Sequence, residues 1–90
     1  MRKIEEEMLK AIINKYQWSK DNTTVYASPR KCEVWLHGNH IADVFNDYSV
    51  KVNKYTLKRW PTVTTKSRLR ALGVNVYTKN HQIYLNDERL

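Results

Sequence analysis

The first sixteen residues carry an apolar stripe with helical spacing, and the rest of the chain is broken by turn residues into short runs that favour strands. Ile4, Met8, Ile12 and Tyr16 recur every four residues, which predicts one amphipathic helix. A chain of 90 residues can bury one core only. We therefore expect a single α+β domain over residues 1–90, with one or two helices covering an antiparallel sheet.

Residues 32–45 are typical of a β-hairpin. A two-residue turn at Gly38-Asn39 would let the glycine adopt a positive φ and would pair Val34 with Asp43. The same register places His37 opposite His40, close to the turn. It predicts one apolar face made by Val34, Leu36, Ile41 and Phe45.

The remaining strands are expected on both sides of a short second helix. Residues 23–27 form a β-rich run, and residues 48–55 alternate as a half-buried strand with Lys51 pointing outward. Residues 74–77 and 82–86 predict a C-terminal hairpin with its turn at Lys79-Asn80, pairing Val76 with Ile83. Residues 19–22 look like a polar connection.

The second helix is expected to begin at Thr64 or Thr65, whose hydroxyl can cap the free amides, and to end at Gly73. Its leucines would face the core. Lys66, Ser67 and Arg70 would then lie on the exposed side, with Arg68 at its flank.

The net charge of +7 is concentrated in the second half of the chain. Residues 1–47 carry equal numbers of basic and acidic side chains, whereas residues 48–86 contain no Asp or Glu. Cations without local carboxylates favour an anionic partner wherever they cluster, although a solvated basic surface that aids solubility is the alternative. The basic residues of this stretch are Lys51, Lys54, Lys58, Arg59, Lys66, Arg68, Arg70 and Lys79.

Aromatic rings are interleaved with these cations at Tyr55, Trp60 and Tyr77. Cations that bind phosphates and flat rings that stack on bases are the combination used for nucleic acids. We expect Trp60 to pack in the core or at its edge, so Tyr55 is the ring that joins the eight cations as the predicted binding set. A helix-turn-helix is disfavoured because the second helix is short and no helix directly precedes it.

Catalytic and metal chemistry have little support. His37 and His40 would be neighbours across the turn, but two imidazoles need a third ligand, from Asp43, His81 or Cys32, to hold a metal. The chain has two glycines and no phosphate-binding loop. We therefore expect a non-enzymatic protein without metal or cofactor, in which both histidines serve the turn.

Three segments resemble a family of small proteins encoded by tailed bacteriophages. They are residues 36–42 (LHGNHIA), residues 60–69 (WPTVTTKSRL) and residues 83–86 (IYLN), which are similar to the family patterns LHGN-x-IA, GW-x-(T/S)-x-TTK-x-RLN-x-L and YLN. Arg59 and Arg70 depart from the glycine and asparagine of those patterns and add positive charge. The resemblance implies a phage gene product in the cytoplasm of the infected host, and it implies no particular chemistry.

Two functional hypotheses follow. The first is a phage accessory protein that binds nucleic acid through the basic surface of its C-terminal half. The second is an inhibitor or adaptor that docks on an acidic patch of a host defence or transcription protein. No apolar stretch approaches membrane-spanning length, and the single cysteine cannot form an internal disulfide. Whether an exposed strand edge makes the protein a homodimer stays open.

Overall fold

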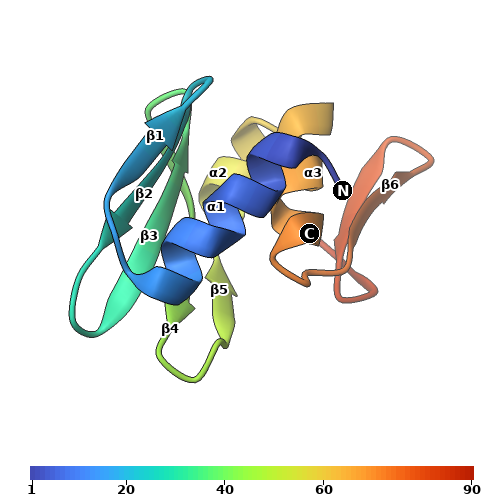
Figure 1. Cartoon of the computed structure of the whole chain (residues 1–90). Coiled ribbons are helices and arrows are strands. Elements are labelled where there is room, and N and C mark those ends of the chain that lie inside the picture. The colour runs from blue at the N-terminus through green and yellow to red at the C-terminus, as the bar shows by residue number, and fades with distance from the viewer.

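The structure is a computed structural model that describes all residues from 1 to 90, and it contains two antiparallel sheets separated by helices (Figure 1). The larger sheet has five strands in the order β1-β2-β3-β4-β5, and the smaller has three in the order β6-β7-β8. The elements are α1 (Lys3–Asn14), β1 (Trp18–Lys20), β2 (Thr23–Ala27), β3 (Lys31–Leu36), β4 (Asn39–Phe45), β5 (Val50–Val52), α2 (Lys54–Arg59), α3 (Val63–Ala71), β6 (Val76–Lys79), β7 (Gln82–Leu85) and β8 (Glu88–Arg89).

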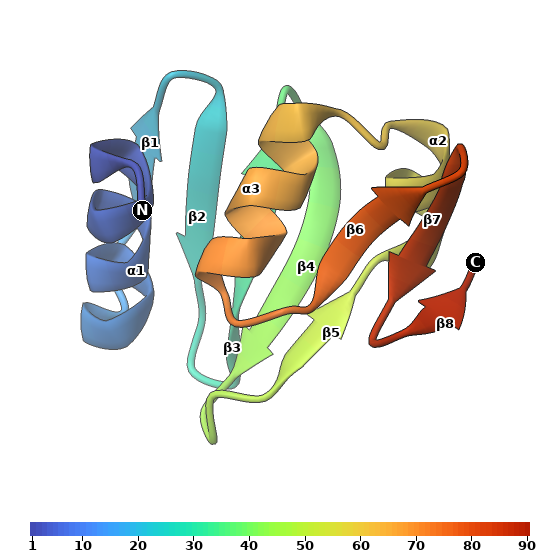
Figure 2. The same cartoon turned by 90° about the vertical axis from the view of Figure 1, so that its right-hand side faces the viewer.

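The helices form a middle layer. α1 lies along β1 and β2, α3 lies across β4, and α2 lies beyond α3 near one end of β4 (Figure 2). The small sheet packs on the side of α3 that faces away from the large sheet (Figure 1). The outer face of the large sheet is left without a covering helix. The expected α+β class, with a leading helix, an antiparallel sheet and a C-terminal hairpin, is confirmed.

The core lies between the inner face of the large sheet and the helices. Apolar side chains meet there because their removal from water is the main favourable term in folding. The predicted stripe of α1 is confirmed at Met8 and Ile12, which are buried, whereas Tyr16 lies beyond the end of the helix at Asn14 and is exposed. The buried apolar residues are Met8, Ala11, Ile12, Val25, Cys32, Val34, Leu36, Ile41, Ala42, Val44, Leu57, Leu69, Val76 and Leu85.

Tight turns connect four pairs of neighbouring strands. Both central residues of each turn have a positive φ, which is the conformation of a type I′ turn and matches the twist of the strands it joins. Only one of the four turns contains a glycine, and Asn, Asp and His hold all of the other central positions. The turns are Asp21-Asn22, His37-Gly38, Asn80-His81 and Asn86-Asp87.

The predicted register of the first hairpin is wrong. The turn is at His37-Gly38, and a bulge in β4 places Trp35 opposite His40 but Val34 opposite Ala42. The bulge lets Ile41 and Ala42 both point into the core, and beyond it every residue of β4 changes face relative to the prediction. Val44 is therefore buried, and Phe45 moves to the outer face.

The C-terminal hairpin differs by two residues along one strand. Its turn is at Asn80-His81, so Val76 pairs with Leu85 instead of Ile83. A shift of two residues leaves the same side chains on the same face, and the predicted apolar face is retained. The sheet gains β8 after the Asn86-Asp87 turn, and residues 19–22 contain the end of β1 and its turn rather than a connection alone.

α3 begins before the predicted residues. Thr62 caps it, because its Oγ1 accepts a hydrogen bond from the backbone N–H of Thr65 at 3.1 Å. The predicted end at Gly73 is confirmed, with a φ of +91°. The N–H of Val74 donates to the carbonyl of Leu69, and the N–H of Gly73 donates to that of Arg70, which together form a Schellman motif.

Candidate nucleic-acid interface

α2 occupies residues that were expected to continue a strand or a loop. The alternation of β5 ends at Val52, and Asn53 then caps the helix by accepting a hydrogen bond from the N–H of Thr56 at 3.1 Å. Pro61 follows one residue after the last helical turn and cannot continue the helix. Thr56 and Leu57 are buried, so the rest of this short helix faces solvent.

The exposed face of α2 carries cations and aromatic rings side by side. Lys54 and Lys58 are one turn apart, and so are Tyr55 and Arg59, which places the four side chains on adjoining strips of the helix. The Arg59 guanidinium donates to the Tyr55 hydroxyl at 3.2 Å, and its carbon lies 5.6 Å from the centroid of the Trp60 ring. We call Lys54, Tyr55, Lys58, Arg59 and Trp60 the α2 surface.

No carboxylate neutralises the α2 surface. The acidic partners of all five ion pairs are carboxylates from the first half of the chain, and none of those pairs includes a residue of α2. Tyr55 is 71% exposed and Trp60 is 46% exposed. Three cations and two accessible aromatic residues therefore lie together on one surface.

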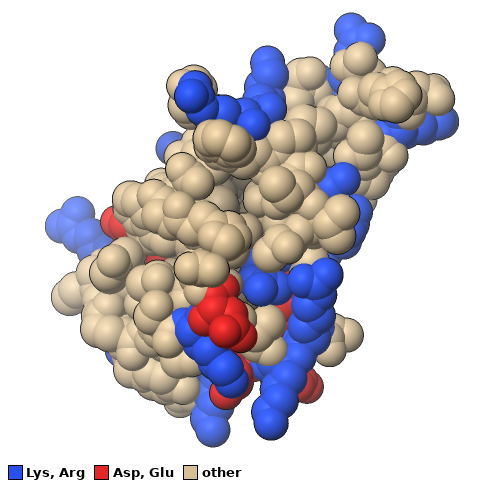
Figure 3. Space-filling model, turned by 90° about the horizontal axis from the view of Figure 1, so that it is seen from above, with Lys and Arg blue, Asp and Glu red and all other residues tan.

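The other predicted cations do not join this surface. Lys51 points from the outer face of the large sheet, opposite Asp43. Lys66 donates to the hydroxyl of Thr78, Arg70 donates to the carbonyl of Val76, and Lys79 ends β6. Figure 3 shows Lys and Arg side chains in separate groups around the end-on view of the molecule. The expectation of one continuous basic surface is therefore too broad.

Arg68 is a clear correction, because it is buried rather than exposed at the flank of a helix. Its side chain is only 5% exposed, and its Nη1 lies 2.7 Å from Oε2 of Glu5 on α1. Its Nε donates to the Thr23 hydroxyl of β2, and the Ser67 hydroxyl donates to the same oxygen of Glu5. This cluster joins α1, α3 and the sheet, and it removes Arg68 from the candidate interface.

The pKa of Glu5 reflects this environment. Burial acts to raise it, but hydrogen bonds from Ser67, Arg68 and the backbone N–H of Arg2 outweigh burial and hold the pKa below its ordinary value. Glu5 is therefore a carboxylate at neutral pH, and its charge is matched by the guanidinium of Arg68.

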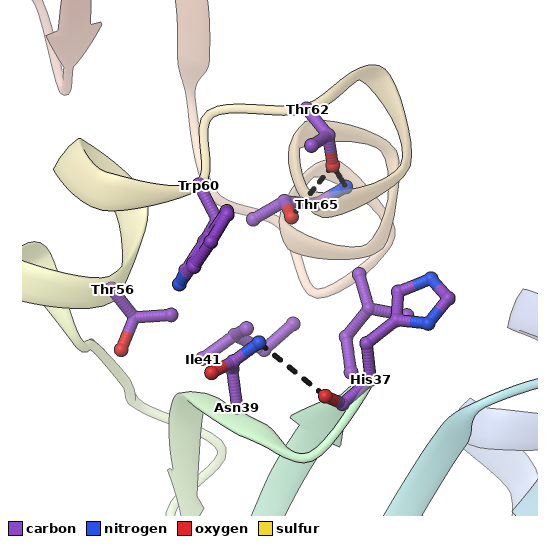
Figure 4. A pocket seen from close by; sticks show the side chains of 8 residues that line it. His37, Asn39, Ile41, Thr56, Trp60, Thr62 and Thr65 are labelled. Carbon is purple, nitrogen blue, oxygen red and sulfur yellow. Dashed lines mark hydrogen bonds between the residues drawn. The ribbon is translucent and has the colours of Figure 1, made fainter.

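A pocket of about 290 Å³ lies beside the α2 surface, and Trp60 belongs to both (Figure 4). Figure 4 shows the Trp60 and His37 rings on opposite sides, Asn39 and Ile41 on the side of the sheet, and the start of α3 across from them. The expectation that Trp60 packs in the core or at its edge is wrong: the residue is 46% exposed, and its ring forms one wall of the pocket. The lining residues are Leu36, His37, Asn39, Ile41, Thr56, Trp60, Thr62 and Thr65.

The pocket could not be predicted from the sequence because its walls come from segments that are far apart in the chain. His37 and Asn39 belong to the turn between β3 and β4, whereas Thr62 and Thr65 begin α3. The capping threonine of α3 was the one local signal for this wall. The sequence predicts Thr64 or Thr65 as the cap, whereas the cap in the structure is Thr62. These two segments lie within the stretches that carry the phage-family resemblance.

The two histidines are separated rather than paired. His37 lines the pocket, while His40 lies on the outer face of the sheet, where its Nε2 is 2.8 Å from Oδ1 of Asp43 and its ring is 5.3 Å from that of Trp35. No group of three His, Cys, Asp or Glu side chains is placed to hold a metal ion. Burial raises the pKa of the Cys32 thiol, and this disfavours the nucleophilic thiolate.

Taken together, the fold and the site define a small two-sheet α+β domain with a basic aromatic helix beside a pocket. A family model described as Kyanoviridae Gp96 protein matches residues 1–90, and the chain therefore belongs to this family of bacteriophage proteins. No curated protein and no solved structure matches it. None of its helices combines the length and the apolar character needed to cross a membrane.

Proposed function

We propose that this phage protein is a non-enzymatic accessory module that binds nucleic acid through the α2 surface. The observation that carries the proposal is the juxtaposition of Lys54, Lys58 and Arg59, none of them in an ion pair, with the exposed rings of Tyr55 and Trp60. Such a surface can neutralise phosphates and stack on bases at the same time.

The contact between Arg59 and the two rings supports this assignment. The Tyr55 hydroxyl and the Trp60 ring both contact the guanidinium, so less side-chain freedom is lost when it meets a phosphate. Lys54 and Lys58 are free to follow the backbone of a bound strand. Lys66, Arg70 and Lys79 lie elsewhere and add long-range attraction to an anionic polymer.

Fluorescence anisotropy with labelled DNA and RNA oligonucleotides over a series of salt concentrations tests the proposal. Affinity is expected to fall as salt rises, because bound phosphates release counterions. The K54Q/K58Q variant should lose affinity at low salt and reduce the slope of log K against log salt by roughly 0.7–0.9 for each lysine.

The matched control is K3Q/K10Q, which removes the same charge from exposed lysines of α1. It should leave both affinity and slope nearly unchanged. Equal losses in the two variants would mean that net charge alone attracts the polymer, and no binding at low salt would end the proposal.

The second candidate function is an adaptor or inhibitor that docks on an acidic patch of a host protein. An apolar groove of about 370 Å³ between α1 and β5 favours it, because exposed apolar surface anchors protein partners more often than it contacts nucleic acid. Capture from host lysate with and without nuclease separates the two candidates. One stoichiometric protein that persists after nuclease treatment supports the adaptor.

A further inference from the structure

We infer that the pocket beside α2 receives one unstacked nucleobase, so that the protein prefers single-stranded to duplex nucleic acid. This inference rests on the proposed function and adds the form of the ligand to it. The α2 surface and the pocket share Trp60, so a strand whose phosphates meet the cations of α2 can turn one base into the pocket without leaving that surface.

The walls of the pocket fit the two kinds of surface that a base presents. Its apolar side includes Leu36, Ile41 and the ring of Trp60, which can cover the face of a base. The His37 ring stands across from the Trp60 ring (Figure 4). A planar ligand therefore has the Trp60 ring available to one of its faces.

The polar groups of the pocket fit the edge of a base. Asn39 uses its amide nitrogen only in a long 3.4 Å contact with the carbonyl of His37. Three further polar groups of the pocket form no hydrogen bond within the protein: the side-chain carbonyl of Asn39, the His37 ring and the Thr56 hydroxyl. An amide that offers both a donor and an acceptor is the usual partner of a base edge that does the same.

The threonines at the start of α3 shape the opposite wall. Thr62 and Thr65 bond to each other through their hydroxyls at 2.9 Å, and Thr62 also caps the helix. These bonds hold the wall in place without a ligand, so the pocket is preformed. Its volume of about 290 Å³ is at the lower end for ligand sites, which suits one base better than a dinucleotide.

A base in a duplex cannot enter the pocket without being unpaired, and we therefore expect the protein to prefer single-stranded nucleic acid. Flipping a base out of a duplex costs a few kcal/mol, whereas a single strand pays much less. The sheet face that carries Tyr26 and Trp35 also exposes aromatic rings, but it carries the carboxylates of Glu33 and Asp43, and Lys31 lies 3.3 Å from Asp43. It is therefore the less suitable surface for a polyanion.

The test compares four probes of equal length by anisotropy: oligodeoxyadenylate, oligothymidylate, an oligomer of abasic sites and a duplex. The abasic oligomer keeps every phosphate and lacks every base. We expect it to bind about tenfold more weakly than the better single strand, the size of one base stacked on an aromatic ring. The indole N–H resonance of Trp60 should shift with the intact strand and much less with the abasic one.

Trp60→Leu should remove most of the difference in affinity between intact and abasic strands, and Asn39→Ala should reduce this difference. Tyr26→Leu on the sheet face is the matched aromatic control and should leave the difference unchanged. Circular dichroism establishes that each variant is folded. Equal binding of intact and abasic strands, or of duplex and single strand, would overturn the inference and leave the proposed function standing. Failure of every probe to bind at low salt would instead overturn the proposed function, and the inference with it.

Discussion

α2 and α3 are neighbouring helices from the same carboxylate-free stretch, yet they use their arginines in opposite ways. On α3, Arg68 is buried and ion-paired with Glu5, which comes from the other end of the chain. On α2, Arg59 is exposed, contacts only two aromatic rings and has no carboxylate partner. The difference shows that a basic side chain becomes structural or available for binding according to which acids the fold brings near it.

The energetic reason is desolvation. A buried guanidinium costs several kcal/mol unless a carboxylate and further acceptors satisfy it, and Arg68 has both Glu5 and Thr23. Arg59 stays in water and needs no such partner. Four kinds of change test this contrast between the two helices.

The largest effect is expected for Arg68→Met. Removing the guanidinium leaves the Glu5 carboxylate buried without its counter-ion, so the free energy of unfolding should fall by about 3–5 kcal/mol. Urea denaturation measures this loss. Lys58→Met on α2 is the matched control and should change stability by less than about 0.5 kcal/mol.

A double variant sharpens the same point. Glu5→Leu combined with Arg68→Met removes both charges and should be more stable than Arg68→Met alone, because no unpaired ion stays buried. If the double variant is as unstable as the sum of the two single variants, the pair does not act as a unit.

Acid should destabilise the protein through the Glu5–Arg68 pair that joins α1 and α3. Because the pKa of Glu5 is lowered in the folded state, its contribution to stability is present above the ordinary pKa of 4.5 and is lost as the pH falls through the lowered folded-state pKa. Urea denaturation at a series of pH values should show stability falling below about pH 4.5.

The control for this pH series is Glu5→Gln, which should be less stable at neutral pH and lose less stability in acid. Asp47→Asn tests a second contribution of the same sign, because hydrogen bonds from the hydroxyl and backbone N–H of Ser49 lower the pKa of Asp47. An unchanged acid transition in Glu5→Gln would contradict the assignment.

Removing the N-terminal cap of each helix should have a smaller effect on stability than removing the Arg68 charge. Thr62→Ala removes the hydroxyl that caps α3 and should lower the free energy of unfolding by about 1 kcal/mol. Asn53→Ala should affect chiefly α2 and appear as faster hydrogen exchange of the Thr56 and Leu57 amides. Asn53→Asp keeps the acceptor and should restore their protection; equal exchange in both variants would show that the cap is not needed.

A last test of similar size concerns how α3 ends. Gly73→Ala places a residue with a Cβ in the left-handed region at a φ of +91°. The free energy of unfolding should fall by about 1 kcal/mol from backbone strain alone, since no atom lies within 4 Å of the added Cβ to clash with it. Thermal denaturation gives the shift. Gly73→Asn should be milder, since asparagine tolerates this conformation better. No equivalent exists on α2, which Pro61 ends.

The membership of the candidate site was only partly predictable. The absence of Asp and Glu from residues 48–86 indicated cations without carboxylate partners, which holds for Lys54, Lys58 and Arg59 on α2 but fails for Arg68, whose partner Glu5 comes from the other end of the chain. A count of charges does not contain the chain topology. The topology decides that the pocket forms between two remote segments, and it places four predicted cations away from α2: Lys51, Lys66, Arg70 and Lys79.

Local patterns in the chain were sufficient for α1, for most strands and for the apolar face of the last hairpin, because these follow from side-chain periods of 3.6 and 2 over a few residues. Only the tertiary structure decided three features: the one-residue shift of the hairpin turn with its bulge at Ile41, the burial of Arg68, and the position of Trp60 in the wall of the pocket. Each of these depends on which distant surface is available to pack against or to pair with. A strand period cannot choose between two registers, and a charge cannot find its partner, until the helices and sheets are in contact.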